Sequence, residues 1–387
     1  MSSLKSIAEK FNICIECAKD YKLKRYIEMS NSNISECNLC NTKNKTLELS
    51  NNPDFANFIR ALIRYHYWED EYNTHFGGDS INDILSNDNP IIYHKRIVDD
   101  SVLDDLVGII EDYKFDTEGI VELWYGHIDD IRWSFGERIK DVKAISISQL
   151  EKELLEKNHF LLEKQFTEKI LNFVDYLSNN INIDSIYYRA RIGYKEKVKN
   201  KYNSNYLDKS TDFVYKPYKY QDIGSVPIKK SQEGRLNKKG ESFLYLATDI
   251  ETAISEVRPD PGHIVSIAKF KSVNNIKVVD FDKAFILLSE NENTIKEFTF
   301  LAHIEQILSH PVTKDEKHLY FISQFFADVF RKIGFDGVLF SSSISQGQNL
   351  VVFDPNNFIY IENSSKVFDI KFLKYTYNEL LVNKEEN

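Results

Sequence analysis

The spacing of apolar residues divides the chain into a helical first part and a strand-rich second part. Apolar positions recur every three or four residues from Phe55 to Tyr67 and from Leu103 to Ile110, which predicts two amphipathic helices. The same spacing over residues 148–177 predicts one longer helix. Its apolar positions are Leu150, Leu154, Leu161, Phe166, Ile170, Phe173 and Leu177.

A different pattern begins after the polar segment 178–182, which we interpret as a boundary between domains. Short apolar runs then predict at least six strands, at Ile186–Ile192, Phe243–Ala247, Ile264–Lys271, Ile276–Phe281, Gly337–Phe340 and Leu350–Phe353. Helices are expected at Ile250–Val257, Thr294–Leu308 and Leu319–Ile333. Because strands and helices do not alternate regularly, the pattern favours an α+β fold over a doubly wound one.

The four cysteines all lie within the first forty residues, as two C-x-x-C pairs: Cys14 with Cys17 and Cys37 with Cys40. Two such pairs bring four thiolates to one tetrahedral ion, and a shell of four thiolates leaves no position for substrate. We therefore predict a structural Zn²⁺ site in a zinc ribbon over residues 1–48. Disulfides in an exported protein, or four unrelated thiols, are the alternatives, and no export signal supports the first.

Composition limits the classes of partner. The net charge of the 387-residue chain is −10, which argues against extensive nucleic-acid binding while allowing a local basic pocket for a small anion. No apolar run is long enough to span a membrane, so a cytoplasmic protein is expected. The length predicts more than one domain. We expect a helical domain over residues 49–180 and a second, α+β domain over 181–387.

The segment from Gly234 to Glu256 carries the strongest chemical signal. Arg235 lies in a loop between two glycines, Tyr245 lies in a short apolar strand, and Glu256 follows eleven residues after that tyrosine. A loop cation, an aromatic ring and an isolated carboxylate suit a phosphate-bearing nucleotide and a developing positive charge on its sugar.

Four blocks carry a resemblance to a known family. They are Tyr188-Arg189-Ala190-Arg191, the loop Gly234–Gly240, the strand Leu244–Ala247 with Thr252–Pro259, and Phe335–Ser342 with Gly347–Phe353. In this order they resemble the RES domain family, named for arginine, glutamate and serine. That family is linked to NAD⁺ breakdown and is similar in fold to ADP-ribosyltransferases. Several of its members are toxins restrained by an antitoxin.

The resemblance implies roles for the arginines. Arg189 matches the family arginine, with Arg191 as the alternative. Residues two apart on a strand point to the same face, so both could reach a pyrophosphate. Arg235 is expected to contact a phosphate, because the glycines beside it permit close backbone approach. Solvated surface arginines and an ordinary glycine turn are the alternative interpretations.

The resemblance also implies that the Tyr245 ring stacks on nicotinamide or adenine, and that Glu256 stabilises the ribosyl cation or holds the ribose 2-hydroxyl. Thr248 or Asp249 is expected to cap the helix that carries Glu256. A structural tyrosine, and a carboxylate paired with Arg258 or a lysine, are the alternatives.

Ser342, with Ser341 and Ser343 as alternatives, is expected to bond the nicotinamide amide or a phosphate rather than act as a nucleophile. Asn349 could bind the cofactor similarly, or merely satisfy a turn. Phe340 stands where many family members have tyrosine, so a hydroxyl contact from that position is absent.

The N-terminal half resembles the HEPN/RES-type region that precedes RES domains. HEPN domains can be ribonucleases that use an arginine and a histidine four to six residues apart. Arg60 and His66 approach that spacing. Such a pair also arises by chance on a helix, so ribonuclease activity is left open.

These features together predict an NAD⁺-consuming enzyme, a glycohydrolase or phosphorylase, that acts as a toxin or in phage defence. ADP-ribosyl transfer to a macromolecule and a non-catalytic sensor or binding protein are the alternatives. An enzyme that consumes NAD⁺ would harm its own cell, so an inhibitor protein or an activating trigger is an expected partner. A homo-oligomer is left open.

Overall fold

The computed structural model of the chain describes residues 11–30, 32–49, 54–70, 80–111, 124–126, 147–200, 213–289, 292–309 and 320–373. Its described N-terminal part begins with a three-stranded antiparallel sheet in the order β1-β3-β2. The strands are β1 (Asn12–Cys14), β2 (Asn33–Glu36) and β3 (Lys43–Glu48). Helix α2 (Tyr21–Met29) follows β1, and the Asp20 side chain accepts from the amides of Lys22 and Leu23 at its start.

The two shorter helices predicted for the first half are confirmed, as α3 (Phe55–His66) and α5 (Asp100–Glu111). Short elements lie between and beyond them. These are α4 (Ile81–Ser86), the 3₁₀ helix η2 (His94–Arg96), and the antiparallel pair β4 (Trp68–Asp70) and β5 (Trp124–Gly126).

The prediction of one long helix over 148–177 is wrong. The segment forms α6 (Ile147–Glu156), α7 (His159–Leu171) and α8 (Val174–Leu177). The Asn158 side chain accepts from the amide of Phe160 at 2.9 Å, which starts a new helix and breaks the apolar repeat. Leu161, assigned to the apolar side, is accordingly 53% exposed.

The polar segment expected as a boundary is also structured. Residues Ser178–Ile181 form β6, an edge strand that pairs antiparallel with β12 (Ile276–Asp280). The apolar pattern did not predict β6, because three of its four side chains are polar. A strand can nevertheless form there, since the backbone makes the hydrogen bonds of the sheet and an edge strand tolerates polar residues.

The second part of the chain is built on a nine-stranded sheet in the order β15-β11-β7-β10-β14-β13-β12-β6, with β16 also paired to β11. Only β12 and β13 run parallel among its pairs of described strands. The remaining strands are β7 (Ile186–Ile192), β10 (Leu244–Ala247), β11 (Ile264–Ser272), β13 (Gly337–Ser341), β14 (Gln348–Val352), β15 (Phe358–Tyr360) and β16 (Lys366–Asp369). The mixed architecture agrees with the predicted α+β class.

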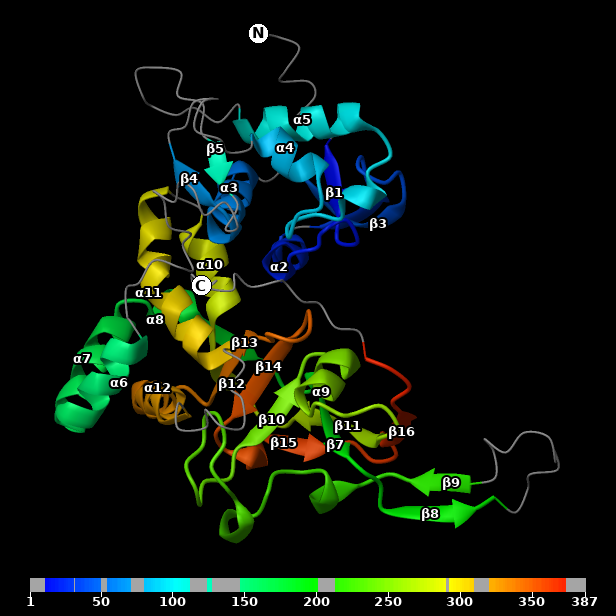
Figure 1. Ribbon diagram of the computed structural model, residues 1–387, viewed down its shortest axis with the longest axis vertical. Coiled ribbons are helices and arrows are strands. Elements are labelled where there is room, and N and C mark those ends of the chain that lie inside the picture. The colour runs from blue at the N-terminus through cyan, green and yellow to red at the C-terminus, as the bar shows by residue number, and fades with distance from the viewer. Residues whose placement is uncertain are drawn as a thin grey trace, which may run out of the picture.

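Four helices accompany this sheet: α9 (Ile250–Glu256), α10 (Phe281–Leu288), α11 (Glu292–Ser309) and α12 (Tyr320–Ile333). Three were predicted, and α10 was not. The hairpin β8 (Glu196–Lys199) and β9 (Phe213–Lys216) lies outside the sheet and extends away from it in Figure 1. Short 3₁₀ turns complete the fold, η4 (Tyr220–Asp222), η5 (Ile228–Lys230) and η7 (Pro355–Asn357).

The two halves of the chain share one hydrophobic core. Figure 1 shows α10 and α11 between the N-terminal elements and the large sheet. The rings of Phe58 on α3 and Phe285 on α10 meet edge to face, with centroids 5.8 Å apart. Phe58, Phe285 and Phe298 are fully buried in the same cluster. We call the described residues between 11 and 126 the N-terminal segment. This segment is therefore packed against the part of the chain that carries the candidate site. Within the described residues, every helix is too short or too polar to span a membrane.

Candidate active site

A cavity of about 410 Å³ opens between β7, β10, α9 and the loop 234–240. Of the seven residues predicted for catalysis or cofactor binding, five line it. These are Arg189, Arg235, Tyr245, Glu256 and Asn349. The cavity is also lined by Tyr188, Ala190, Leu246, Ala247, Ala253, Val257, Arg258, Tyr320 and Phe340.

Arg189 lies on β7, beside the strand that carries Tyr245. Its Nη1 donates to the Tyr245 carbonyl at 2.6 Å, which ties the guanidinium to the neighbouring strand. Burial lowers the pKa of Arg189 to about 10, because desolvation disfavours its charge. The side chain nevertheless stays protonated near neutral pH, so it presents a fixed positive charge to the cavity.

Arg191 does not line the cavity, although it shares a strand face with Arg189. Its Nη1 donates to the carbonyl of Asp222, and its guanidinium lies 4.5 Å from the centroid of the Tyr218 ring. Arg191 pairs with Ser266 of β11, near the end of β7 and away from the strand β10. Arg189 and Arg191 lie two residues apart on β7, as predicted, but the cavity does not extend along the strand as far as Arg191.

The glycine-bounded loop is held by Asn237. The Asn237 amide donates to the carbonyls of Gln232, Lys238 and Glu241 at 2.9, 3.1 and 3.2 Å. At Gly234, a Cβ would lie 2.5 Å from Asn237 Oδ1, so this position has no room for a side chain. Gly240 has φ of +87°, a conformation that suits glycine.

Arg235 extends from that loop to the cavity wall. Its Nη1 donates to the Leu308 carbonyl at 2.6 Å, near the end of α11. Burial lowers the pKa of Arg235, and the charge of Glu256 opposes that shift. A guanidinium has five N–H donors, so one bond leaves capacity for an anion.

The Tyr245 hydroxyl belongs to the loop. It donates to Asn237 Oδ1 at 2.8 Å and accepts from the amide of Leu236 at 3.2 Å. Burial raises the pKa of Tyr245 to about 12. The ring still lines the cavity, so it both supports the loop and offers an aromatic face to a ligand.

Glu256 is the last residue of α9, the helix that Asp249 caps by accepting from the Thr252 amide. Its Oε1 accepts hydrogen bonds from Ser342 Oγ at 2.7 Å and from Asn349 Nδ2 at 2.6 Å. Neither donor uses Oε2. The carboxylate is therefore oriented through one oxygen.

Ser342 and Asn349, both expected to bond a ligand, each donate a hydrogen bond to Glu256 in the structure. Ser342 is not among the cavity-lining residues and contacts Glu256 directly, and Asn349 lines the cavity while bonding the same oxygen. Ser341 contacts Asp282 at 3.4 Å, and Ser343 is exposed. Of the three serines considered, Ser342 is the one that meets the carboxylate.

Sequence reasoning assigned no binding function to three polar residues of the lining: Tyr188, Arg258 and Tyr320. Arg258 follows Val257, the residue that ends α9, and has φ of +47°, in the left-handed region that non-glycine residues rarely adopt. Tyr188 precedes Arg189 in the block Tyr188–Arg191, so its position next to the predicted arginine could have indicated that it lines the site. Tyr320 is the first residue of α12, and only the tertiary fold brings it to the site.

The cavity is positive although the chain is acidic. Three arginines and one glutamate line it, which leaves an excess of two positive charges against a net chain charge of −10. Such a pocket favours a ligand with two negative charges, and partial burial strengthens the attraction.

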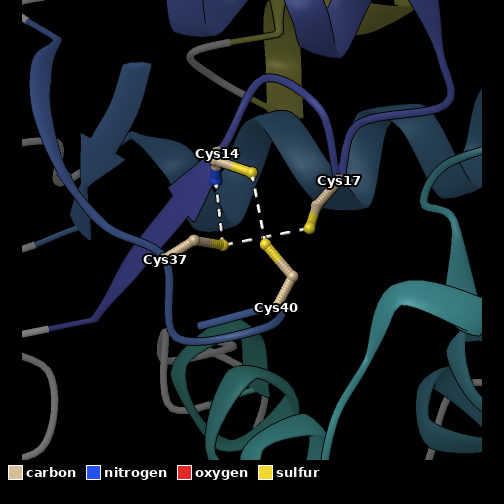
Figure 2. A group of neighbouring side chains, drawn as sticks. All are labelled: Cys14, Cys17, Cys37 and Cys40. Carbon is tan, nitrogen blue, oxygen red and sulfur yellow. Dashed lines mark hydrogen bonds between the residues drawn. The ribbon is translucent and has the colours of Figure 1, made fainter. Parts of the chain in front are cut away.

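The four cysteines form a second candidate site in the N-terminal part (Figure 2). Their sulfurs all lie within 4.8 Å of one another. Two sulfur pairs, Cys14 with Cys40 and Cys17 with Cys37, are 3.7 and 3.9 Å apart. A Zn–S bond of about 2.3 Å in a tetrahedron implies sulfurs about 3.8 Å apart. The Cys14 amide donates to Cys37 Sγ at 3.3 Å. This arrangement fits a metal ion.

The histidine of the HEPN-like pair is engaged within the protein. His66 Nε2 lies 2.7 Å from Asp20 Oδ2, at the start of α2, and Arg60 is only 5% exposed. A ribonuclease pair must be open to an RNA backbone, so this placement gives no support to a site there.

Three comparisons with known proteins bear on the chain. The solved structures include a chain of the M. tuberculosis MbcT–MbcA toxin–antitoxin complex, with 12% identity and a TM-score of 0.27. That similarity covers 53% of this chain and 93% of the other. The comparison with curated proteins found no match. Residues 206–370, which include the loop 234–240, Glu256 and Ser342 but begin after Arg189, match the RES domain family.

Proposed function

We propose that this protein cleaves the bond between nicotinamide and ribose in NAD⁺, on a fold similar to that of ADP-ribosyltransferases. Water or phosphate would be the acceptor. The observation that carries the proposal is the position of Glu256, an oriented carboxylate, in the same cavity as Arg189 and Arg235. The match of residues 206–370 to the RES domain family supports it.

The charge and shape of the cavity suit this substrate. The pyrophosphate of NAD⁺ carries two negative charges, which the arginine excess would balance, and the planar guanidinium can bind phosphate oxygens in pairs. The volume of about 410 Å³ lies within the usual range of ligand pockets, about 300–1,000 Å³. The rings of Tyr188, Tyr245 and Tyr320 could pack against nicotinamide or adenine.

The chemistry requires a carboxylate and no general acid. Nicotinamide in NAD⁺ is a cationic leaving group, and it takes the electron pair of the C–N bond as it departs. The ribose carbon then develops positive charge, as in glycoside transfer, and forms its new C–O bond to water, which releases a proton to solvent, or to an oxygen of phosphate. Glu256 would stabilise that charge or hold the ribose 2-hydroxyl. Ser342 and Asn349 would keep the carboxylate in the required orientation.

The proposal is tested by following nicotinamide release from NAD⁺ by the full-length protein. Glu256→Gln should abolish most of the release while thermal unfolding remains near that of the wild type. Glu251→Gln is a matched control, because Glu251 is exposed at the opposite end of the same helix. Its activity should equal that of the wild type.

Three parallel reactions identify the acceptor of the ADP-ribosyl group. Free ADP-ribose with water indicates a glycohydrolase, and ADP-ribose 1-phosphate with added phosphate indicates a phosphorylase. Transfer of label from NAD⁺ to protein or nucleic acid in a lysate indicates a transferase. If the wild type releases no nicotinamide in any of them, with and without lysate as a source of a trigger, a non-catalytic binding protein replaces the proposal.

The proposed reaction also implies a biological role. Consumption of NAD⁺ harms the cell that contains the enzyme, so we propose a toxin or phage-defence effector that an inhibitor protein restrains or a trigger activates. A Zn²⁺ ion on Cys14, Cys17, Cys37 and Cys40 would have a structural role, because a closed shell of four thiolates has no open position for substrate. It would stabilise the N-terminal segment, because metal binding contributes to the free energy of folding.

A further inference from the structure

The hairpin formed by β13 and β14 has two chemically different sides. Ser342 and Asn349 bond Glu256 on one side. Their neighbours in sequence, Ser341 and Gln348, are paired with each other across the hairpin. Because side chains alternate along a strand, these neighbours face the other side of the sheet. That side meets the N-terminal segment.

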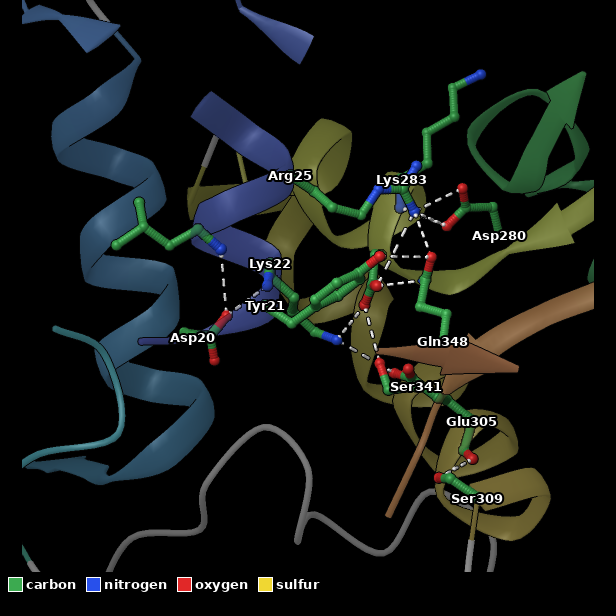
Figure 3. Close-up of polar contacts among 12 residues, drawn as sticks. Asp20, Tyr21, Lys22, Arg25, Asp280, Lys283, Glu305, Ser309, Ser341 and Gln348 are labelled. Atoms are coloured by element: carbon green, nitrogen blue, oxygen red, sulfur yellow. Dashed lines mark hydrogen bonds and ion pairs between the residues drawn. The ribbon is translucent and has the colours of Figure 1, made fainter. Parts of the chain in front are cut away.

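A cluster of buried charges lies where α2 meets the sheet (Figure 3). We call it the ion cluster: Lys22, Arg25, Asp280, Asp282 and Glu305. Lys22 Nζ lies 2.5 Å from Asp282 Oδ1 and 3.6 Å from Glu305 Oε2. Arg25 Nη1 lies 2.8 Å from Asp280 Oδ2. The side chains are at most 12% exposed, so these contacts are shielded from water.

Gln348 joins the hairpin to this ion cluster. Its Nε2 donates to Asp282 Oδ2 at 2.5 Å, and its Oε1 accepts from Tyr21 at 3.2 Å and from Arg25 at 3.4 Å. Ser341 Oγ contacts Asp282 Oδ1 at 3.4 Å. Both strands of the hairpin are thereby bonded, directly or through Asp282, to side chains of α2.

The tip of the hairpin has a separate attachment. Gln346 Nε2 donates to the Tyr93 hydroxyl at 3.1 Å, and its Oε1 accepts from Lys24 Nζ at 3.3 Å. The Tyr93 amide donates to the carbonyl of Cys17 at 2.9 Å. The region around the four cysteines therefore reaches the loop that contains Ser342.

We infer that Gln346 and Gln348 are positioning residues, through which the N-terminal segment holds the β13–β14 hairpin so that Ser342 and Asn349 can orient Glu256. This inference rests on the proposed function. It assigns to α2 and Tyr93 a part in catalysis, whereas an ordinary packing interface would affect stability alone.

Gln346→Ala in the full-length protein is the first test, because Gln346 is exposed and its loss leaves the core intact. A misoriented carboxylate weakens transition-state stabilisation, so kcat should fall about three- to tenfold with little change in KM. Tyr93→Phe removes only a hydroxyl and should act in the same direction. Gln165→Ala, at an exposed glutamine on α7, should match the wild type.

The second test asks whether Gln346 acts through Ser342. In a Ser342→Ala background, Gln346→Ala should cause a clearly smaller loss of kcat than in the wild type, because the Ser342 bond is already absent and only the Asn349 bond can still be disturbed. Losses that simply add would overturn the inference, since they indicate independent effects. A rise in kcat for Gln346→Ala would also overturn it, because the contact would then restrain the enzyme.

Hydrogen exchange separates this inference from the proposed function. If the wild type releases no nicotinamide, the proposed function fails, and amide exchange over residues 342–349 decides the inference. Faster exchange there in Gln346→Ala and Tyr93→Phe, but not in Gln165→Ala, would show that the N-terminal segment holds the hairpin. Unchanged exchange in all three variants would overturn it.

Discussion

Ser342 Oγ donates a 2.7 Å hydrogen bond to Oε1 of Glu256, across 86 residues of sequence. Asn349 donates to the same oxygen from the adjacent strand. A carboxylate at the C-terminal end of a helix is unfavourable with respect to the helix dipole, and two donors offset that cost. The orientation of the carboxylate therefore depends on α9 and on the β13–β14 hairpin together.

Ser342→Ala should lower kcat by about ten- to hundredfold, since a hydrogen bond to a charged group contributes roughly 1.5–3 kcal/mol. KM should change little, because the arginines that would bind the phosphates are untouched. Ser342→Thr retains the hydroxyl and should keep most of the activity. Steady-state kinetics of nicotinamide release measures both, and equal activity of the alanine variant and the wild type would contradict the assignment.

Tyr245→Phe should destabilise the protein by about 1–3 kcal/mol, because it leaves Asn237 Oδ1 and the amide of Leu236 without their partner. The ring would remain in the cavity. Urea unfolding measures the change. Tyr220→Phe is the control, because Tyr220 is 55% exposed and its hydroxyl bond to Glu362 is 3.5 Å long. Equal losses in the two variants would show that the loop does not depend on the Tyr245 hydroxyl.

The cysteine site should hold one zinc ion per chain. Metal analysis of the purified protein should detect it, and the double variant Cys14→Ser, Cys37→Ser should lose it. A strong chelator should lower the melting temperature of the wild type, because a structural metal contributes folding free energy. Metal content that is the same in the wild type and the double variant would refute the assignment.

The apolar pattern predicted the central strands well and the elements defined by tertiary contacts poorly. The bounds of β7 match the prediction, Ile186–Ile192. The predicted strand Ile276–Phe281 runs one residue into α10, which Asp280 caps by accepting from the amide of Lys283 at 3.0 Å. The apolar run continues across that cap, so periodicity alone does not show the change from strand to helix.

Motif spacing located the carboxylate and the aromatic ring but could not supply their partners. Tyr245 and Glu256 lie on adjacent elements, so a local spacing places both near one cavity. The bonds of Glu256 to Ser342 and Asn349 depend on the pairing of β13 with β14 and of β14 with β10. That pairing has no local signal in the sequence. The alternation of side chains along a strand predicted that Arg191 and Arg189 share a face, but it could not show that the cavity ends before Arg191.

The ion cluster has two cations and three carboxylates, so protonation of one carboxylate would balance its charge. Glu305 is the candidate, because burial raises the pKa of its carboxyl above the usual 4.5 despite the opposing charge of Lys22. A carboxyl with a raised pKa binds its proton more tightly in the folded state than in the unfolded chain. Stability is then lost as pH rises from about 4.5 through the folded pKa.

Glu305→Gln should therefore raise the melting temperature at pH 8, and its advantage should shrink as pH falls toward 4.5. The amide keeps the shape of the side chain and removes the titration. Glu297→Gln, at an exposed position of the same helix, should follow the wild type at every pH. Thermal unfolding across this pH range measures the difference. A Glu305→Gln variant that is less stable at pH 8 would instead mean that Glu305 is ionised and that its pairing with Lys22 outweighs the cost of burial.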